Sequence, residues 1–107
     1  MNNKIKLYKQ EIDNIYSSGK HLKSSYVKLI FLKNDLNINR IVFSIKKQSA
    51  NAVQRNKIKR RIKSIICRNE TINGFDIVIG VFPEIKLASF EDLQKDLKKI
   101  IAKLVIM

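Results

Sequence analysis

Basic side chains crowd one continuous segment of this chain. Between Leu36 and Asn69 the sequence has ten lysine and arginine residues and no acidic residue. The densest part runs from Asn51 to Lys63 and reads NAVQRNKIKRRIK. Guanidinium groups form paired hydrogen bonds to phosphate, and ammonium groups attract phosphate as point charges. The residue types and their density therefore indicate recognition of a phosphate backbone.

The same segment orders its charge when it is wound as a helix. At about 100° per residue, Ile58, Ile62, Ile65 and Ile66 fall on one face. The opposite face carries cations and small polar residues, namely Lys57, Lys59, Arg60, Lys63 and Arg68 with Asn56 and Ser64. One face can therefore enter a hydrophobic core while the other face presents a positive stripe.

The net charge of the whole chain supports a polyanionic partner. The 107 residues carry a formal charge of +13, and 45% of them are hydrophobic, which is enough to fill a modest core. Self-repulsion at that charge disfavours the compact state, so a negatively charged partner is expected. RNA, DNA and an anionic membrane surface all qualify. A membrane surface would need large apolar residues facing the lipid, whereas the isoleucines here are needed for the core.

A protein-based active site is not predicted. The nine carboxylates are scattered, and the single Cys67 and single His21 offer no disulfide, no cysteine metal site and no catalytic triad. The three glycines form no phosphate-binding loop. No apolar run is long enough for a signal peptide or a membrane span. We expect no catalytic residue, no metal ligand, no membrane or small-molecule partner, and a cytoplasmic location.

Three helices are predicted. Polar and apolar residues recur at helical spacing over residues 11–17, and Ser18 and Gly19 end that helix. The charged helix is expected to begin after the N-cap Asn51, with Gln54 completing a capping box, and to end near residue 68. A second capping pattern at Ser89 and Asp92 predicts the last helix. Its buried side would hold Phe90, Leu93, Leu97, Ile100, Ile101 and Leu104.

Three strands are predicted between these helices, at residues 26–32, 40–47 and 75–81. The first two are close in sequence and are expected to pair as an antiparallel hairpin. On the first strand, alternation separates Val27, Leu29 and Phe31 from Tyr26, Lys28 and Ile30. On the second strand it separates Ile41, Phe43 and Ile45 from Val42, Ser44 and Lys46. The predicted order is α-β-β-α-β-α in a single domain, residues 1–107.

The run from Arg40 to Lys63 resembles a family signature. It reads RIVFSIKKQSANAVQRNKIKRRIK and is similar to the signature of the bacterial ribonuclease P protein subunit. In that family a strand ends in serine and paired lysines, Asn-Ala-Val follows, and an Arg-Asn-Arg helix continues with further cations. The flanks also resemble the family, at Ile12, Ile15, Tyr16, Gly19, the strand from Phe75 and the turn at Pro83. The chain departs from the pattern at Ile12, Lys57 and Val81, which stand where the family has an aromatic residue, an arginine and often a basic residue.

The resemblance implies a fold and an activity. The fold would be α+β, an α-β-β-α-β-α sandwich with a left-handed βαβ crossover, helices packed on the sheet and one open cleft face. The family's protein is the non-catalytic subunit of an endoribonuclease that removes the 5′ leader of precursor tRNA. The chemistry would belong to the RNA subunit and to Mg²⁺ bound mainly by that RNA. The implied partners are ribonuclease P RNA and precursor tRNA.

The resemblance also implies two groups of site residues. The catalytic RNA would be bound by Arg55, Asn56, Lys57, Lys59, Arg60, Arg61 and Lys63. The leader would lie between the first helix and the open sheet face, against Ile12, Tyr16, Tyr26, Lys28, Ile30, Ser44, Lys46 and Lys47. Two alternatives stay open. A ribosomal or other structured-RNA-binding protein without a cleavage role needs the basic helix but no leader cleft. A protein-only nuclease needs a carboxylate cluster, which the sequence does not show.

Overall fold

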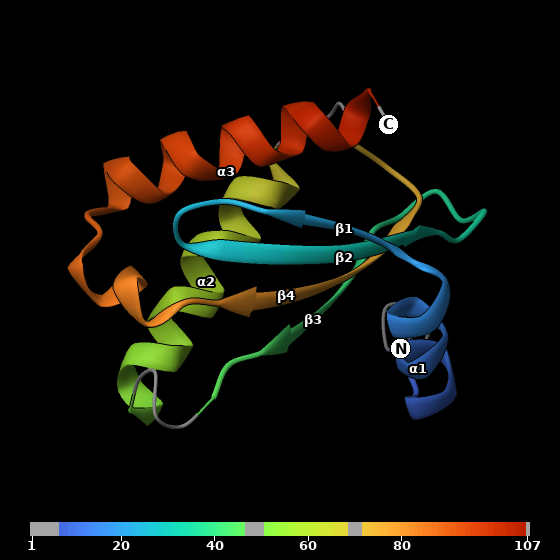
Figure 1. Ribbon diagram of the computed structural model, residues 1–107, viewed down its shortest axis with the longest axis horizontal. Helices are drawn as coiled ribbons and strands as arrows, with labels where there is room; N and C mark the ends of the chain where they lie inside the picture. The colour runs from blue at the N-terminus through green and yellow to red at the C-terminus, as the bar shows by residue number, and fades with distance from the viewer. Residues whose placement is uncertain (1–6, 47–50, 69–71, 107) are drawn as a thin grey trace.

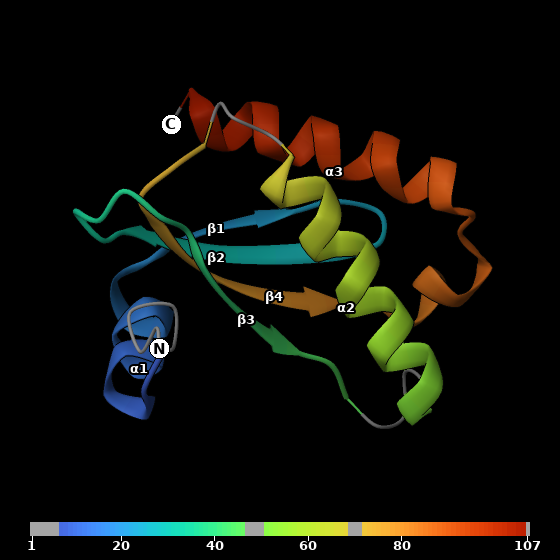
Figure 2. The same cartoon turned by 180° about the vertical axis from the view of Figure 1, so that it is seen from behind.

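The computed structural model describes residues 7–46, 51–68 and 72–106, and Figure 1 shows a mixed α and β fold. In chain order the elements are α1 (Lys9–Ser18), β1 (Lys20–Lys23), β2 (Val27–Lys33), β3 (Arg40–Ser44), α2 (Ala52–Cys67), β4 (Phe75–Val81), the 3-10 helix η2 (Pro83–Leu87) and α3 (Phe90–Val105). One four-stranded sheet has α2 and α3 on one face and α1 on the other (Figures 1 and 2). The predicted α+β class is confirmed.

The strand order in the sheet is β1-β2-β4-β3. β4 pairs antiparallel with β2, where Val78 lies opposite Ile30, and parallel with β3, where Val78 lies opposite Val42. The sequence predicts a hairpin of the strands at residues 26–32 and 40–47, which correspond to β2 and β3. This prediction is wrong, because β4 lies between them in the sheet. β4 is almost wholly buried. An apolar strand of this kind is most stable in the centre of a sheet, where both of its faces are covered.

The connection from β3 through α2 to β4 is a left-handed crossover. The two strands are parallel neighbours, and α2 lies in front of the sheet in Figure 2. In that view both strands run to the right and β4 lies above β3. A right-handed connection with α2 toward the viewer would place β4 below β3. Nearly all βαβ units are right-handed, so the left-handed form implied by the resemblance is a distinguishing feature of this fold.

The strand boundaries differ in part from the prediction. β1 is not predicted, because its sequence Lys-His-Leu-Lys has a single apolar residue and shows no alternation. It forms by backbone pairing with the neighbouring β2, where Lys20 lies opposite Phe31. β2 begins and ends one residue later than predicted, and β3 ends at Ser44. The predicted strand at Phe75–Val81 is confirmed.

The caps of α2 and α3 are those that the sequence predicts. The Asn51 side chain accepts a hydrogen bond from the Gln54 backbone N–H at 2.8 Å, and the Gln54 side chain accepts one from the Asn51 N–H at 3.0 Å. Ser89 and Asp92 make the same pair of bonds before α3. Each cap satisfies backbone groups that the first helical turn leaves unpaired. α2 and α3 therefore start where local sequence places them.

Two hydrophobic clusters lie on opposite faces of the sheet. The larger cluster joins α2 and α3 to alternate residues of β2 and β4, with Ile62 and Leu97 among its fully buried members. The smaller cluster joins α1 to the other face through Ile15, Ile30 and Val78. α2 buries Ile62, Ile65 and Ile66 of the predicted isoleucine face and leaves Ile58 half-buried against the cluster. α3 buries the predicted apolar face except for one residue. That exception is Phe90, which is 38% exposed because it occupies the first position of α3, at the rim of the core.

Candidate RNA-binding surfaces

The outer face of α2 is a positive surface. Asn56, Lys57, Arg60 and Lys63 are exposed there, and Lys59 is half-buried. The ion pairs among the described residues lie elsewhere, between α1, β3 and β4 and within α3. These lysines therefore have no carboxylate partner within the described part of the chain. The surface can bind phosphates without first breaking an internal ion pair.

Two arginines of the predicted RNA-binding set are less accessible. Arg55 is half-buried in the first turn of α2. Arg61 is also half-buried, and its guanidinium carbon lies 5.5 Å from the centroid of the Phe90 ring. Cation–π contacts of this kind contribute about 0.5–1 kcal/mol at exposed sites. Arg61 thereby connects α2 to the start of α3, a contact that the charge pattern of the sequence does not indicate.

The sheet face that carries α1 also has a basic hollow. Lys28, Ser44 and Lys46 line it together with Gly80 and residues 81–83, and its volume is about 270 Å³. Lys28 and Ser44 are both register partners of Gly80, so three neighbouring strands contribute adjacent positions. The absent side chain of Gly80 leaves room for the Lys28 side chain, whose Cε lies 2.9 Å from the place where a Cβ would stand. The structure thus brings together three of the predicted leader-binding residues.

Ile30 and Tyr26, which the resemblance also assigns to the leader site, do not line this hollow. Ile30 shares the face with Lys28 but is only 3% exposed, because it packs in the cluster under α1. Tyr26 packs against the larger cluster, on the opposite face. Strand alternation fails at Tyr26 because it precedes β2, in a turn held by Asp96, whose Oδ2 accepts the Tyr26 backbone N–H at 3.1 Å. Lys47 lies outside the described residues.

α1 presents one aromatic side chain beside this face. Tyr16 is 45% exposed, so its ring is accessible for stacking. Ile15 is buried in the smaller cluster, and Ile12 is half-buried against it. Helical spacing in the sequence cannot separate a residue that packs the core from one that lines a cleft. The structure makes this distinction, because it shows which side of α1 lies on the sheet.

A buried ion pair joins the strands near α1. Arg40 of β3 contacts Asp76 of β4 with Nε 2.7 Å from Oδ1, and its Nη2 lies 2.8 Å from Glu11 Oε2 on α1. The hydrogen bond to Asp76 raises the pKa of the Arg40 guanidinium above its ordinary value, with a smaller opposing effect from burial. No motif in the sequence links these three residues, since they come from three separate elements.

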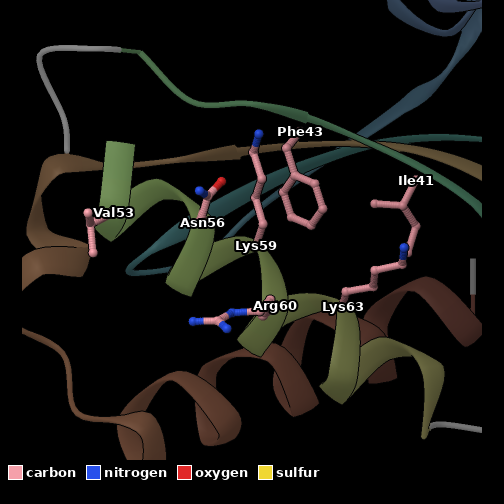
Figure 3. A pocket seen from close by; sticks show the side chains of 7 residues that line it. All are labelled: Ile41, Phe43, Val53, Asn56, Lys59, Arg60 and Lys63. Carbon is pink, nitrogen blue, oxygen red and sulfur yellow. The ribbon is translucent and has the colours of Figure 1, made fainter. Parts of the chain in front are cut away.

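A groove on the other side of β3 is missed by reasoning from the sequence. Figure 3 shows its lining, which consists of Ile41, Phe43, Val53, Asn56, Lys59, Arg60 and Lys63 around a volume of about 670 Å³. Alternation assigns Ile41 and Phe43 to the core, and they do pack against the larger cluster. Both nevertheless remain half-buried, because β3 is an edge strand of the sheet. Only knowledge of the strand order could have identified this groove.

The described residues contain neither a cluster of metal-binding side chains nor a membrane-spanning helix. No three His, Cys, Asp or Glu side chains among residues 7–46, 51–68 and 72–106 are grouped so that they could hold a metal ion. In the same ranges, every helix is too short or too polar to cross a bilayer.

The sequence matches the family model described as Ribonuclease P over residues 1–105. This chain belongs to the ribonuclease P protein family. The ribonuclease P protein component of Thermoanaerobacter sp. (strain X514) is 30% identical over 95 residues, which are 87% of this chain and 82% of the relative. The ribonuclease P protein component of Clostridioides difficile (strain 630) is 31% identical over 106 residues, which are 94% of this chain and 93% of the relative.

Solved structures show the same fold. The RNase P protein from Thermotoga maritima, in complex with 1-(4-fluorophenyl)-2-thiourea, matches with a TM-score of 0.78 at 29% identity, over 88% of this chain and 94% of that chain. The Staphylococcus aureus RNase P protein matches with a TM-score of 0.82 at 23% identity, over 92% and 93%, and at that identity the likeness supports the fold alone. Membership in the ribonuclease P family gives this chain a role in ribonuclease P, an endoribonuclease. The resemblance recognised at Arg40–Lys63 is confirmed.

Proposed function

We propose that this chain is the protein subunit of a bacterial ribonuclease P ribonucleoprotein and assists removal of the 5′ leader from precursor tRNA. Family membership supports the proposal. The structural observation that carries it is the exposed cationic face of α2, which stands on a buried isoleucine face. The net charge of +13 suits a protein that works between two RNA molecules.

The outer face of α2 binds the catalytic RNA in this proposal. Lys57, Arg60 and Lys63 are exposed and recur every three residues, which places them along one side of the helix. Each phosphate contact releases counterions, so the affinity should fall steeply with salt concentration. The buried Ile62 holds the helix against the core, and the cations are therefore carried by a rigid element.

The basic hollow on the sheet face that carries α1 binds the leader. Lys28 and Lys46 supply positive charge for its phosphates, the Ser44 hydroxyl can donate or accept a hydrogen bond, and Tyr16 exposes a ring on which a base can stack. Stacking on an aromatic face tolerates any base, and cations recognise the backbone. The leader is therefore expected to bind with little sequence preference.

The chemistry belongs to the RNA subunit in this proposal, together with Mg²⁺ bound mainly by that RNA. The protein contributes cations that reduce the repulsion between substrate and catalytic RNA, and it orients the leader. The two buried carboxylates of the described part of the chain are engaged within the protein. Asp76 accepts hydrogen bonds from Arg40, and Asp96 accepts one from the Ser24 hydroxyl at 2.6 Å. We assign both a structural role.

Reconstitution at low Mg²⁺ concentration tests the proposal. The purified chain is added to the ribonuclease P RNA of Clostridioides difficile, and cleavage of a precursor tRNA with a 5′ leader is followed. Cleavage that requires both components is the expected result. Tight RNA binding without rescue of cleavage would support a structured-RNA-binding protein instead. Cleavage by the protein alone would overturn the assignment of chemistry to the RNA.

A matched pair of triple variants tests the role of the α2 face. Replacing its three exposed cations with glutamine should abolish rescue at low Mg²⁺, because the phosphate contacts are lost; these are Lys57, Arg60 and Lys63. Replacing three exposed lysines of α3 removes the same charge from another surface and should preserve rescue; these are Lys98, Lys99 and Lys103. Equal loss in both variants would mean that net charge, and not the α2 face, supports cleavage.

A further inference from the structure

We infer that the groove between β3 and α2 receives one unstacked base of the RNA that binds α2, with the Phe43 ring as its stacking surface. This inference rests on the proposed function and adds a second mode of contact to it. The groove volume of about 670 Å³ lies within the range of about 300–1,000 Å³ that is usual for small-molecule sites. One wall of the groove is apolar and the other is cationic (Figure 3).

The apolar wall comes from the edge strand. Among the described strands β3 pairs only with β4, so none of them covers the outer side of Ile41 and Phe43. Both side chains pack against the larger cluster and stay half-buried, which fixes the ring without covering it. Val53 at the start of α2 is 78% exposed and continues the apolar surface. A fixed aromatic ring with an accessible face is the feature on which proteins stack unpaired bases.

The cationic wall comes from α2. In Figure 3 the Lys59 side chain runs beside the Phe43 ring, Lys63 extends toward Ile41, and Arg60 points away from the strand. The described residues that line the groove include no acidic side chain. A base in the groove would therefore have its flanking phosphates near ammonium groups and no carboxylate opposite them. This charge complementarity favours a nucleotide over an apolar or basic peptide.

The position of the groove indicates which part of an RNA can enter it. Arg60 and Lys63 belong both to the groove and to the phosphate-binding face of α2, so one RNA segment can contact both. A fully paired helix presents its phosphates but keeps its bases stacked inside. A bulged or unpaired base can be turned outward, and proteins recognise RNA sequence mostly at such sites. The groove would thus make α2 prefer RNA with an unpaired base.

Two RNA hairpins with the same stem test the inference, one fully paired and one carrying a single bulged nucleotide. The full chain should bind the bulged hairpin at least about 5-fold more tightly, because stacking of one base is worth roughly 5- to 150-fold in affinity. Phe43→Leu keeps an apolar side chain but removes the ring, so this preference should fall to near unity while the paired hairpin binds as before. Equal binding of both hairpins by the unmodified chain would overturn the inference.

Phe75→Leu is the matched control. Phe75 is also half-buried against the larger cluster, but it lies outside the groove, so the preference should persist. Loss of the preference in both variants would show that general packing is responsible, and would overturn the inference. A 4-thiouridine at the bulge should crosslink to the peptide that contains Phe43, and crosslinks confined to α3 would contradict the proposal. The hairpin assay involves no cleavage, so its failure is distinct from failure of the reconstitution test.

Discussion

Arg40 and Asp76 form a two-armed ion pair across the parallel strands β3 and β4. The Arg40 Nε atom lies 2.7 Å from Asp76 Oδ1, Nη2 lies 2.7 Å from Oδ2, and the two residues are register partners. Their side chains are only 12% and 9% exposed. Glu11 of α1 contacts Arg40, and the Asn34 amide donates to Asp76 Oδ1 at 2.8 Å. The pair therefore connects β3 and β4 with α1 and the loop after β2.

The first prediction concerns this network. Asp76→Asn should lower the free energy of unfolding by about 3 kcal/mol, because it leaves a buried guanidinium without its main counter-charge. Urea unfolding measures the effect. Glu91→Gln is the control, since it breaks the exposed pair to Lys95, whose atoms are 3.5 Å apart, and no measurable change is expected there. An unchanged urea midpoint for Asp76→Asn would show that the buried pair adds nothing to stability.

The pH dependence of this network follows from the direction of the Arg40 shift. The pKa of Arg40 is raised in the folded protein, chiefly by the hydrogen bond to Asp76. A raised pKa means that the contribution of Arg40 to stability is complete below its ordinary value, and is lost only as the pH rises through the folded-state value. Urea midpoints of the unmodified protein and of Arg40→Met are measured between neutral pH and pH 10. The difference between the two midpoints should stay constant over this range.

The second prediction concerns the salt dependence of RNA binding. Lys57→Ala should weaken binding to ribonuclease P RNA and reduce the slope of log affinity against log salt by about one unit, because one phosphate contact disappears. Lys98→Ala removes an exposed lysine from α3 and should leave the slope unchanged. A salt titration of both variants gives the comparison. Identical slopes would place Lys57 outside the interface.

The third prediction concerns the leader. Tyr16→Ala should weaken binding of precursor tRNA to the holoenzyme by roughly 5- to 150-fold, because one stacked base loses its platform. Binding of mature tRNA, which has no leader, should not change. Tyr16→Phe keeps the ring and should retain leader affinity. If mature and precursor tRNA lost affinity equally, Tyr16 would act through the fold and not through the leader.

The fourth prediction contrasts two glycines. The three atoms nearest to a Cβ at Gly80 all belong to the flexible side chain of Lys28, whose Cε and Cγ would lie at 2.9 and 3.1 Å. Gly80→Ala should therefore reduce leader affinity by displacing Lys28, with little change in urea midpoint. A Cβ at Gly19 would collide with the carbonyl oxygen of Ile15 and lie 2.9 Å from that of Phe31. Because backbone cannot move aside as a side chain can, Gly19→Ala should cost about 1–3 kcal/mol in unfolding free energy.

The two glycine variants distinguish an effect on leader binding from an effect on the stability of the fold. Urea unfolding and leader binding are measured on both variants. A destabilised Gly80→Ala protein with normal leader affinity would show that Gly80 serves packing, which would contradict its place in the leader hollow.

Local patterns in the sequence were sufficient for α2. Helix capping and helical periodicity involve residues that are fewer than five positions apart in the chain. The sequence therefore predicts the N-cap at Asn51, the burial of Ile62 and the exposure of Lys57 and Lys63. The central strand Phe75–Val81 was also predictable, because a short and mostly apolar run is typical of a buried strand. The signature from Arg40 to Lys63 was likewise readable in the chain itself.

The tertiary structure alone decided the partners of each strand. Strand order depends on contacts between distant segments, so the sequence could not show that β4 inserts between β2 and β3. That insertion leaves β3 at an edge, which keeps Phe43 only half-buried and opens the groove against α2. It also brings Arg40 beside Asp76, which lies 36 positions away in the chain. The sequence by itself determined which residues carry the charge and how α2 presents it, because those properties are local. Only long-range packing decided that Ile30 is buried and Phe43 is half-buried.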